Sequence, residues 1–175
     1  NKYDFLSQEY GGKTRNNKWY GILIQMKNSL SHRGPDDEHV SLFPHAGFAH
    51  TRLSIRDIRG GRQPMSASFK GQSATIVYNG EIYNAEELRE LLAPYKLRWH
   101  TTCDTEVILN GYLAMGESFF SRLNGIFAFS IYNHTANKMI LARDPLGVKP
   151  LFYMVRGDEI LFASEIKGIL AVPGI

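Results

Sequence analysis

Apolar residues recur along this chain at two different spacings, and each spacing predicts a kind of element. Between residues 19 and 30 they recur at intervals of three and four, which is the spacing of one face of an amphipathic helix. Pro35 disfavours helical geometry at the residue before it, so this helix should end before the segment 32–36. The first 17 residues are polar and contain a Gly-Gly and an Asn-Asn pair, which predicts a loop or a loosely held insertion.

Two more helices are predicted from their start and stop signals. Asn84 is a good N-cap, and Glu87 three residues later completes a pair that resembles a capping box. A further helix should run from 104 to 115, because acidic Asp104 in its first turn favours the helix dipole and Gly116 is a suitable residue just past its end.

Strands are predicted where short β-branched or aromatic runs are bounded by glycine or proline, first at 48–55 and 75–78. Later in the chain, apolar segments follow one another at short spacing with turn residues between them, which is typical of an antiparallel meander. These segments are 125–132, 138–143, 151–155 and 160–163. Helices combined with antiparallel strands favour an α+β fold with helices outside and sheets inside.

The composition is that of one ordinary globular domain, with 175 residues of which 43% are hydrophobic and 21% charged. The formal net charge is +3, but basic residues are scattered among acidic ones without the clustered stripe of a nucleic-acid binder. No apolar run approaches the roughly 20 residues needed to cross a bilayer, so neither nucleic acid nor membrane is an expected partner. The one cysteine, Cys103, excludes an intramolecular disulfide and a cysteine-based metal site, and it suits a reducing cytoplasm.

Five short motifs occur in order between residues 32 and 151. They are His32-Arg33-Gly34-Pro35-Asp36, His50-Thr51-Arg52-Leu53-Ser54-Ile55 with Asp57, Tyr78-Asn79-Gly80-Glu81-Ile82-Tyr83-Asn84, Asp104-Thr105-Glu106, and Arg143-Asp144-Pro145-Leu146-Gly147-Val148-Lys149-Pro150-Leu151. Together they resemble the class II glutamine amidotransferase domains, in particular those of the glutamine-hydrolysing asparagine synthetases. We interpret the first and last motifs as supports for a pocket or for a neighbouring domain.

The resemblance implies that residues 1–175 form one amidotransferase domain with the four-layer αββα sandwich of the N-terminal nucleophile hydrolases. It implies hydrolysis of L-glutamine to glutamate and ammonia, and transfer of the ammonia to a C-terminal synthetase domain that amidates aspartate. ATP and Mg²⁺ would belong to that synthetase domain, so no cofactor or metal is expected in this chain. The expected partners are L-glutamine and the synthetase domain, and a homodimer is a candidate assembly.

Glutamine presents an α-carboxylate, an α-ammonium and a side-chain amide, so its site needs a guanidinium and carboxylates. By resemblance, Arg52 holds the α-carboxylate, Asp104 pairs with the α-ammonium and Glu81 supplies a second polar contact. Backbone carbonyls around Ile55 and Arg56 would also face the substrate. Each charged residue alone also fits a simpler role: a surface arginine, an acid at a helix start, or a solvated turn residue.

Asn79 and Gly80 form the pair with the most specific chemistry. Amide hydrolysis passes through a tetrahedral oxyanion, which requires donors fixed where the negative charge appears. By resemblance, the Asn79 side-chain amide and the Gly80 backbone N–H form this oxyanion hole. The alternative is structural, because Asn-Gly is also a strongly favoured β-turn dipeptide.

The nucleophile of the resembled family is an N-terminal cysteine, whose own α-amine acts as the base. Residue 1 is Asn, and Cys103 is internal without a free α-amine, so we expect Cys103 to be a small half-buried residue. Two accounts stay open: the native protein begins with a Cys-led strand before Asn1, or the domain is a catalytically silent scaffold as in β-lactam synthetase-like proteins. The intact set of glutamine-contacting residues favours the first account. The chain alone is then expected to be inactive.

Overall fold

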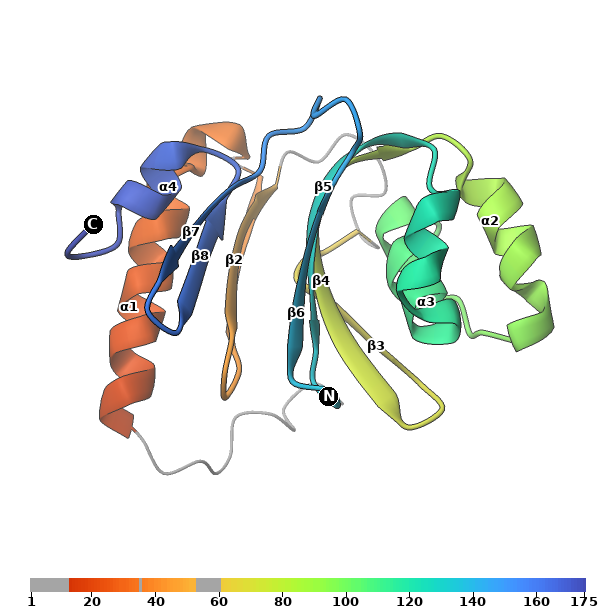
Figure 1. Ribbon diagram of the computed structural model, residues 1–175, viewed down its shortest axis with the longest axis horizontal. Helices are drawn as coiled ribbons and strands as arrows, with labels where there is room; N and C mark the ends of the chain where they lie inside the picture. Colours follow the sequence, from red (N-terminus) through yellow and green to blue (C-terminus); the bar gives the residue numbers. More distant parts are fainter. Residues whose placement is uncertain (1–12, 35, 53–60) are drawn as a thin grey trace.

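The computed structural model describes residues 13–34, 36–52 and 61–175, whose elements stack in four layers (Figure 1). The helices are α1 (Lys13–Ser29), α2 (Ala85–Leu92), α3 (Asp104–Met115) and α4 (Ile166–Leu170), with short 3-10 turns η1 (Ser31–Arg33), η2 (Ala93–Tyr95) and η3 (Gly116–Arg122). The strands are β1 (Asp37–Leu42), β2 (Gly47–Arg52), β3 (Met65–Phe69), β4 (Gln72–Ile82), β5 (Gly125–Asn133), β6 (Lys138–Arg143), β7 (Phe152–Arg156) and β8 (Glu159–Ala163). Helices α1 and α4 form one outer layer, α2 and α3 form the other, and the strands lie between them (Figure 1). This αββα arrangement confirms the predicted α+β class.

The strands among the described residues form three antiparallel sheets in the inner layers. Strands β3 to β6 form one sheet in the order β3-β4-β5-β6, on the side of α2 and α3. The hairpins β1–β2 and β7–β8 form the strand layer beside α1 and α4, and they are separate two-stranded sheets. Side chains nevertheless connect the two hairpins, since the rings of Phe48 on β2 and Phe162 on β8 lie with their centroids 6.0 Å apart.

In the described part of the chain, two apolar cores hold the layers together. In the larger core, alternate residues of β4 and β5 face α3, which is buried from Thr105 to Leu113 because α2, η3 and the sheet surround it. The smaller core joins α1 to β8 and α4, and it consists of Ile22, Leu161, Ala163, Ile169 and Val172, flanked by Trp19, Met26 and Leu30. The apolar stripe predicted for residues 19–30 is therefore confirmed as the buried face of α1.

Helix α1 begins earlier than the apolar pattern indicated. The structure has residues 13–17 as its first turns, so the predicted loop is wrong for this part, while residues 1–12 lie outside the described residues. A helix can extend beyond its apolar stripe because its backbone hydrogen bonds do not depend on apolar side chains, and Lys and Arg are good helix formers. Strands β1 and β3 were not predicted, since neither shows a sustained apolar run.

Asn84 stands at the predicted N-cap of α2, but its side chain does not cap this helix. Its Nδ2 donates to the carbonyl of Arg122 at 3.0 Å, and its Oδ1 accepts from the N–H of Asn124 at 3.0 Å. The predicted capping box is therefore wrong. The amide of Asn84 instead holds the start of α2 against the segment that leads into β5.

The four late strands match their predicted ranges within one residue, but they do not form one meander. Strand β6 pairs with β5 in the four-stranded sheet, whereas β7 pairs with β8 in the other strand layer. Asp144 fixes the crossover between the layers, because its carboxylate accepts from the N–H groups of Val148 at 2.9 Å and Lys149 at 3.0 Å. Burial alone would raise the pKa of this carboxyl group, but these backbone donors, with that of Phe127, lower it. The last motif is thus a layer-to-layer connection.

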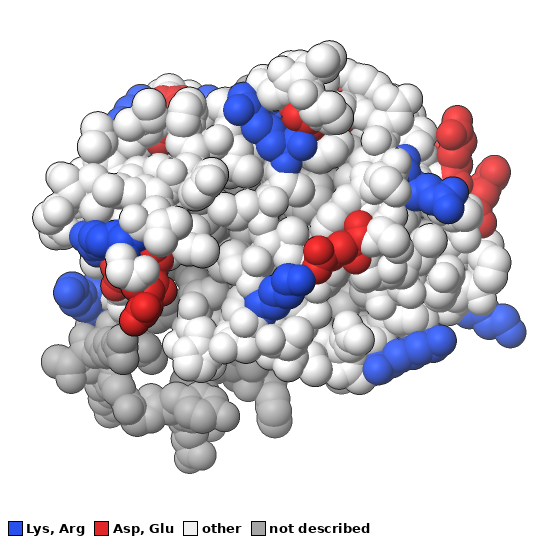
Figure 2. All heavy atoms as spheres, viewed as in Figure 1, with Lys and Arg blue, Asp and Glu red and all other residues white. Residues whose placement is uncertain are grey.

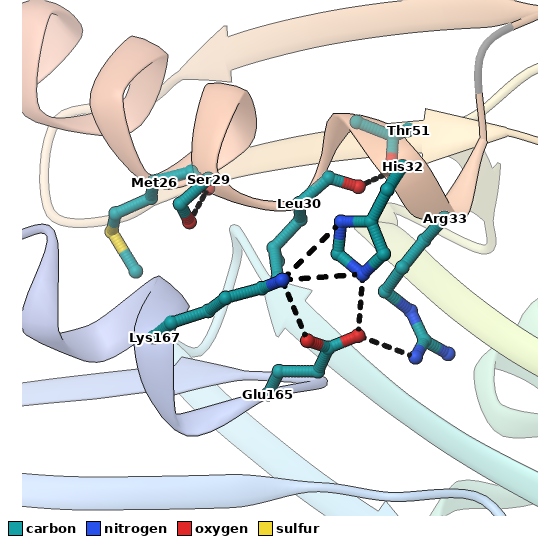
Figure 3. A network of polar contacts seen from close by, with 8 residues as sticks. All are labelled: Met26, Ser29, Leu30, His32, Arg33, Thr51, Glu165 and Lys167. Atoms are coloured by element: carbon teal, nitrogen blue, oxygen red, sulfur yellow. Dashed lines mark hydrogen bonds and ion pairs between the residues drawn. The ribbon is translucent and has the colours of Figure 1, made fainter.

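The first motif links η1 to the beginning of α4 (Figure 3). Arg33 donates from Nη1 to Oε1 of Glu165 at 2.9 Å, and Nε2 of His32 lies 2.9 Å from the same oxygen. Nζ of Lys167 lies 3.2 Å from Oε2. Hydrogen bonds from Arg33 and then His32 lower the pKa of Glu165 to about 2. This cluster supports the fold within the chain, by joining residues 132 positions apart.

Basic and acidic side chains are interspersed on the face that Figure 2 shows, as the scattered charges of the sequence predict. In the part of the chain that the structure describes, no helix combines the length and apolar character needed to cross a membrane.

Candidate active site

One cavity of about 1780 Å³ lies between the two strand layers. It is lined by residues of α1, β2, β4, β5 and β8 and by the residues around the start of α3. Five residues singled out from the sequence are among them: Arg52, Asn79, Gly80, Glu81 and Asp104. The structure therefore brings together residues that are up to 52 positions apart in the sequence, at the ends of β2 and β4 and the start of α3.

Along the edge of β4 beside this cavity, side chains from other segments bind the backbone groups of Tyr78 and Ile82. The side-chain amide of Gln63 accepts from the N–H of Tyr78 at 2.6 Å and donates to its carbonyl at 3.0 Å. Four residues later, the N–H of Ile82 donates to Oδ2 of Asp104 at 3.0 Å. Because backbone groups of a strand alternate in direction with a period of two, the N–H of Gly80 points to this same edge, between Gln63 and Asp104.

The neighbouring strand gives independent support for this direction. Gly80 is opposite Phe127 on β5, but the carbonyl of Phe127 accepts from the N–H of Asp144 at 2.8 Å and its N–H donates to Asp144 at 3.2 Å. Gly80 and Phe127 are thus a pair without mutual ladder hydrogen bonds. The Gly80 N–H is directed away from β5, toward the cavity edge.

Asn79 and Gly80 are interior residues of β4, paired with Ala128 and Phe127, so the alternative of an Asn-Gly β-turn is wrong. The glycine is required by strand packing, because a Cβ at Gly80 would overlap the carbonyl oxygen of Ile126 and lie 2.7 Å from Cα of Phe127. Asn79 lies on the opposite face of β4 from Tyr78 and Ile82, which belong to the core against α3. Its side chain therefore projects between the two strand layers.

Asp104 is the first residue of α3, as predicted, and Cys103 is its N-cap residue. Oδ2 of Asp104 accepts from the hydroxyl of Tyr78 at 2.6 Å, in addition to the bond from Ile82. The carboxylate thus faces β4 rather than open solvent. Cys103 is partly buried, as expected, and its Sγ lies 2.9 Å from the Thr101 hydroxyl.

The segment before α3 is held from both sides. Buried Glu106 accepts from the N–H groups of His100 and Thr101, both at 2.8 Å. Arg89 on α2 donates to the carbonyls of Thr101 and Cys103, both at 3.2 Å. These contacts fix the backbone from 100 to 103, and with it the position of the first turn of α3.

Arg52 ends β2 and lines the cavity. The glycine of the first motif explains how its backbone is placed, since a Cβ at Gly34 would overlap the backbone of Arg52. The N–H of Asp36 donates to the Arg52 carbonyl at 3.0 Å. Glu81 is exposed on β4, one residue from Gly80. Ile55 and Arg56 lie outside the described residues.

His50 on β2 lies close to the backbone of Tyr78 on β4, and this proximity links the two strand layers. Burial lowers the pKa of His50 to about 4, although the nearby backbone of Tyr78 acts in the opposite direction, and the charge of Arg52 lowers it further. The ring is therefore neutral at pH 7. This function of His50 could not be read from the sequence, and Gln63 lies outside all five motifs.

We expect the lowered pKa of His50 to make the fold acid-sensitive. The unfolded chain binds a proton at this residue near pH 6.5 while the folded chain does not, so stability present above pH 6.5 is lost as the pH falls toward 4. A difference of about 2.5 pKa units corresponds to about 3 kcal/mol of unfolding free energy. Urea unfolding of the chain and of His50→Gln across this range measures it.

The pKa of His134 is also lowered by burial, but His134 is present in both proteins and its contribution cancels in the comparison. Parallel stability curves for the two proteins between pH 6.5 and 4 would contradict the assignment.

Within residues 13–34, 36–52 and 61–175, no group of three or more His, Cys, Asp or Glu residues is arranged to hold a metal ion.

Comparison with known proteins identifies the family. Residues 10–175 match the model of the family described as "Glutamine amidotransferase domain". Asparagine synthetase [glutamine-hydrolyzing] 3 of Bacillus subtilis (strain 168) is 49% identical over 153 residues, which cover 87% of this chain and 25% of the relative. Asparagine synthetase [glutamine-hydrolyzing] 1 of the same organism is 42% identical over 149 residues, covering 85% of this chain and 23% of the relative. The chain thus spans about a quarter of the length of these curated relatives.

Solved structures show the same architecture. The glutamine phosphoribosylpyrophosphate amidotransferase from B. subtilis superimposes with a TM-score of 0.69 at 24% identity, over 86% of this chain and 40% of that one. This likeness confirms the N-terminal nucleophile hydrolase fold. The chain therefore belongs to the glutamine amidotransferase domain family and is homologous to the glutaminase part of the glutamine-hydrolysing asparagine synthetases.

Proposed function

We propose that this domain binds L-glutamine in the cavity between the strand layers and hydrolyses its side-chain amide to glutamate and ammonia. The observation that carries the proposal is the convergence of Arg52, Asn79, Gly80, Glu81 and Asp104 on one cavity. These residues supply the guanidinium, the carboxylates and the amide donors that the three polar groups of glutamine require. A scaffold without substrate has no physical need for this combination.

Each residue has a distinct role in the proposal. The guanidinium of Arg52 binds the α-carboxylate, Asp104 pairs with the α-ammonium, and Glu81 supplies a second polar contact. The Asn79 side chain and the Gly80 N–H donate to the oxyanion of the tetrahedral intermediate. The direction of the Gly80 N–H, toward the open edge of β4, supports its part in this role. The backbone contacts from Ile55 and Arg56 remain a proposal based on the family alone.

The nucleophile in this proposal is an N-terminal cysteine, which the α-amine of the same residue activates. The amine takes the proton of the thiol, and the thiolate attacks the amide carbon to form the tetrahedral intermediate. The amine then delivers this proton to the leaving nitrogen, the C–N bond breaks, and ammonia departs while a thioester remains. Water then hydrolyses the thioester to glutamate and regenerates the thiol. The expected inactivity of the present 175 residues follows from this chemistry, since Cys103 has no free α-amine.

The strand layer beside α1 offers a position for a Cys-led strand. The hairpins β1–β2 and β7–β8 are separate sheets, and residues of both β2 and β8 line the cavity that also contains Asn79 and Gly80. We propose that an extended apolar segment carrying the cysteine lies between β2 and β8. Its apolar side chains would contact Ile22 and Leu161, which belong to the core on that side.

We also propose that the ammonia serves a synthetase domain in the same polypeptide, as the names of the relatives suggest. That domain would amidate aspartate with ATP and Mg²⁺, and this domain would need no cofactor of its own. A cytoplasmic location and a homodimeric assembly complete the proposal.

The test is the response to L-glutamine of the chain and of Arg52→Ala. Ligand that binds only the folded state raises the melting temperature, so we expect L-glutamine to stabilise the chain and Arg52→Ala to lose this effect. In a chain completed by a Cys-led strand, Arg52→Ala should raise KM more than it lowers kcat, because the α-carboxylate contact exists before and during the reaction. Loss of this charge-assisted contact should cost about 1.5–3 kcal/mol.

Arg122→Ala is the matched control, since Arg122 is exposed and does not line the cavity. A hundredfold lower kcat with unchanged KM would show that Arg52 has a different role. If L-glutamine stabilises no version of the chain, the silent scaffold becomes the better description.

A further inference from the structure

The hydroxyl group of Tyr78 forms the link between the strand and the helix that meet at the cavity. It donates to Oδ2 of Asp104 at 2.6 Å, and the N–H of Ile82 donates to the same oxygen at 3.0 Å. Both donors come from β4, whereas Asp104 begins α3. Two donors from one rigid strand fix the orientation of the carboxylate, which otherwise rotates about its terminal bonds.

Tyr78 itself is held firmly. Its side chain is only 6% exposed and belongs to the core against α3. The amide of Gln63 pairs with both its N–H and its carbonyl. Burial and then the charge of Asp104 raise the pKa of Tyr78, so its hydroxyl remains protonated and continues to donate. Tyr78 is therefore a fixed donor next to an acidic residue of the proposed substrate site.

We propose that Tyr78 is the positioning residue that makes the site selective for substrates with an α-ammonium group, by orienting the Asp104 carboxylate so that its other oxygen receives the ammonium. This inference rests on the proposed function and extends it to the amino end of the substrate. A carboxylate that is already oriented binds a cation without losing further freedom, whereas a rotating one must be ordered on binding.

Tyr78 also links the part of the site proposed for the α-ammonium to the part proposed for the oxyanion, because it lies on the same strand as Gly80. Gly80, the proposed oxyanion donor, is two residues further along β4, between the positions where Gln63 and Asp104 bind the backbone of this strand. An ammonium bound at Asp104 is thus held at a fixed distance from the N–H of Gly80. A substrate without the ammonium lacks this reference point, so Tyr78 should affect recognition of the amino end and not of the amide.

The test compares L-glutamine with 4-carbamoylbutanoate, which has the same carboxylate and amide but no α-ammonium. Affinities of both compounds for the 175-residue chain and for Tyr78→Phe are measured by calorimetry. We expect the unsubstituted chain to prefer L-glutamine. We expect Tyr78→Phe to bind L-glutamine about tenfold more weakly, the lower end of the effect of a hydrogen bond to a charged group, and to bind the analogue within about twofold of the original affinity.

Tyr112→Phe is the matched control, because it removes the same atom from another buried tyrosine whose hydroxyl accepts from Asn133 at 2.9 Å and which does not line the cavity. It should retain the full preference for L-glutamine. Equal weakening of both compounds in Tyr78→Phe, or no weakening at all, would overturn this inference and leave the proposed function standing. An unsubstituted chain without preference for L-glutamine would overturn the proposed function together with the inference.

A second measurement does not depend on the folding of Tyr78→Phe. The chain is prepared with 3-fluorotyrosine at position 78, and its ¹⁹F resonance is followed during titration with each compound. L-glutamine should shift this resonance, because the ammonium changes the charge at Asp104, and 4-carbamoylbutanoate should leave it in place. Equal shifts with both compounds would contradict a specific link between Tyr78 and the ammonium.

Discussion

The 175-residue chain is expected to release no ammonia from L-glutamine, and the same chain preceded by a Cys-led apolar strand is expected to release it readily. The reaction requires a thiolate with an adjacent α-amine, and the one cysteine of the sequence, Cys103, is internal at the start of α3. Its Sγ lies near the hydroxyl of Thr101, in a segment that Glu106 and Arg89 hold in place. Ammonia release at saturating L-glutamine measures the difference.

Two variants of the completed chain separate chemistry from folding. Replacing the added cysteine by alanine should abolish ammonia release while the strand remains in place, and Cys103→Ser should retain activity. Release of ammonia by the original 175 residues would contradict this account of the nucleophile. A completed chain that folds and binds L-glutamine but stays inactive would favour the silent scaffold.

Local sequence patterns predicted most of the helices and strands, because residues near each element in the sequence determine where it begins and ends. Helix α3 has the predicted bounds, since an acidic residue opens it and Gly116, with a positive φ of 70°, follows its last residue. The observed bounds of the four late strands agree with the predicted bounds within one residue. Residues that strongly favour turns separate these strands, so the ends of each strand are marked in the sequence. These elements depend on neighbours in sequence, which a single sequence contains.

The pairing of the strands depended on contacts that local patterns do not contain. The crossover from β6 to β7 results from Asp144 gathering the N–H groups of its own loop and of Phe127 on β5. In the sequence, the same segment is an ordinary turn between two apolar runs. The prediction that the Asn84 side chain caps α2 was wrong for a similar reason. The backbone groups that bind this side chain belong to Arg122 and Asn124, which are about 40 positions away in the sequence.

The candidate site was predicted as a set of residues but not as a geometry. Motifs singled out Arg52, Asn79, Gly80, Glu81 and Asp104, and the structure places all five at one cavity, while their roles toward glutamine stay predictions. Tyr78 and Ile82, which orient Asp104, belong to the third motif, but Gln63, which holds the backbone of Tyr78, is a buried glutamine outside every motif. The side chain of Gln63 binds the backbone of β4 as a neighbouring strand would, and such a contact leaves no periodic pattern in the sequence.

Asn79→Ala in the completed chain is expected to lower kcat by about 10²–10³, or roughly 2.7–4 kcal/mol, with KM for L-glutamine changed less than about threefold. The oxyanion exists only near the transition state, so its donor contributes little to ground-state binding. Alanine keeps the backbone pairing of Asn79 with Ala128, and position 79 is not part of a turn, so the melting temperature should change little. Both quantities are measured on one preparation. A variant with full turnover would remove Asn79 from the oxyanion hole, and a large rise in KM at constant kcat would place its amide on the ground-state substrate instead.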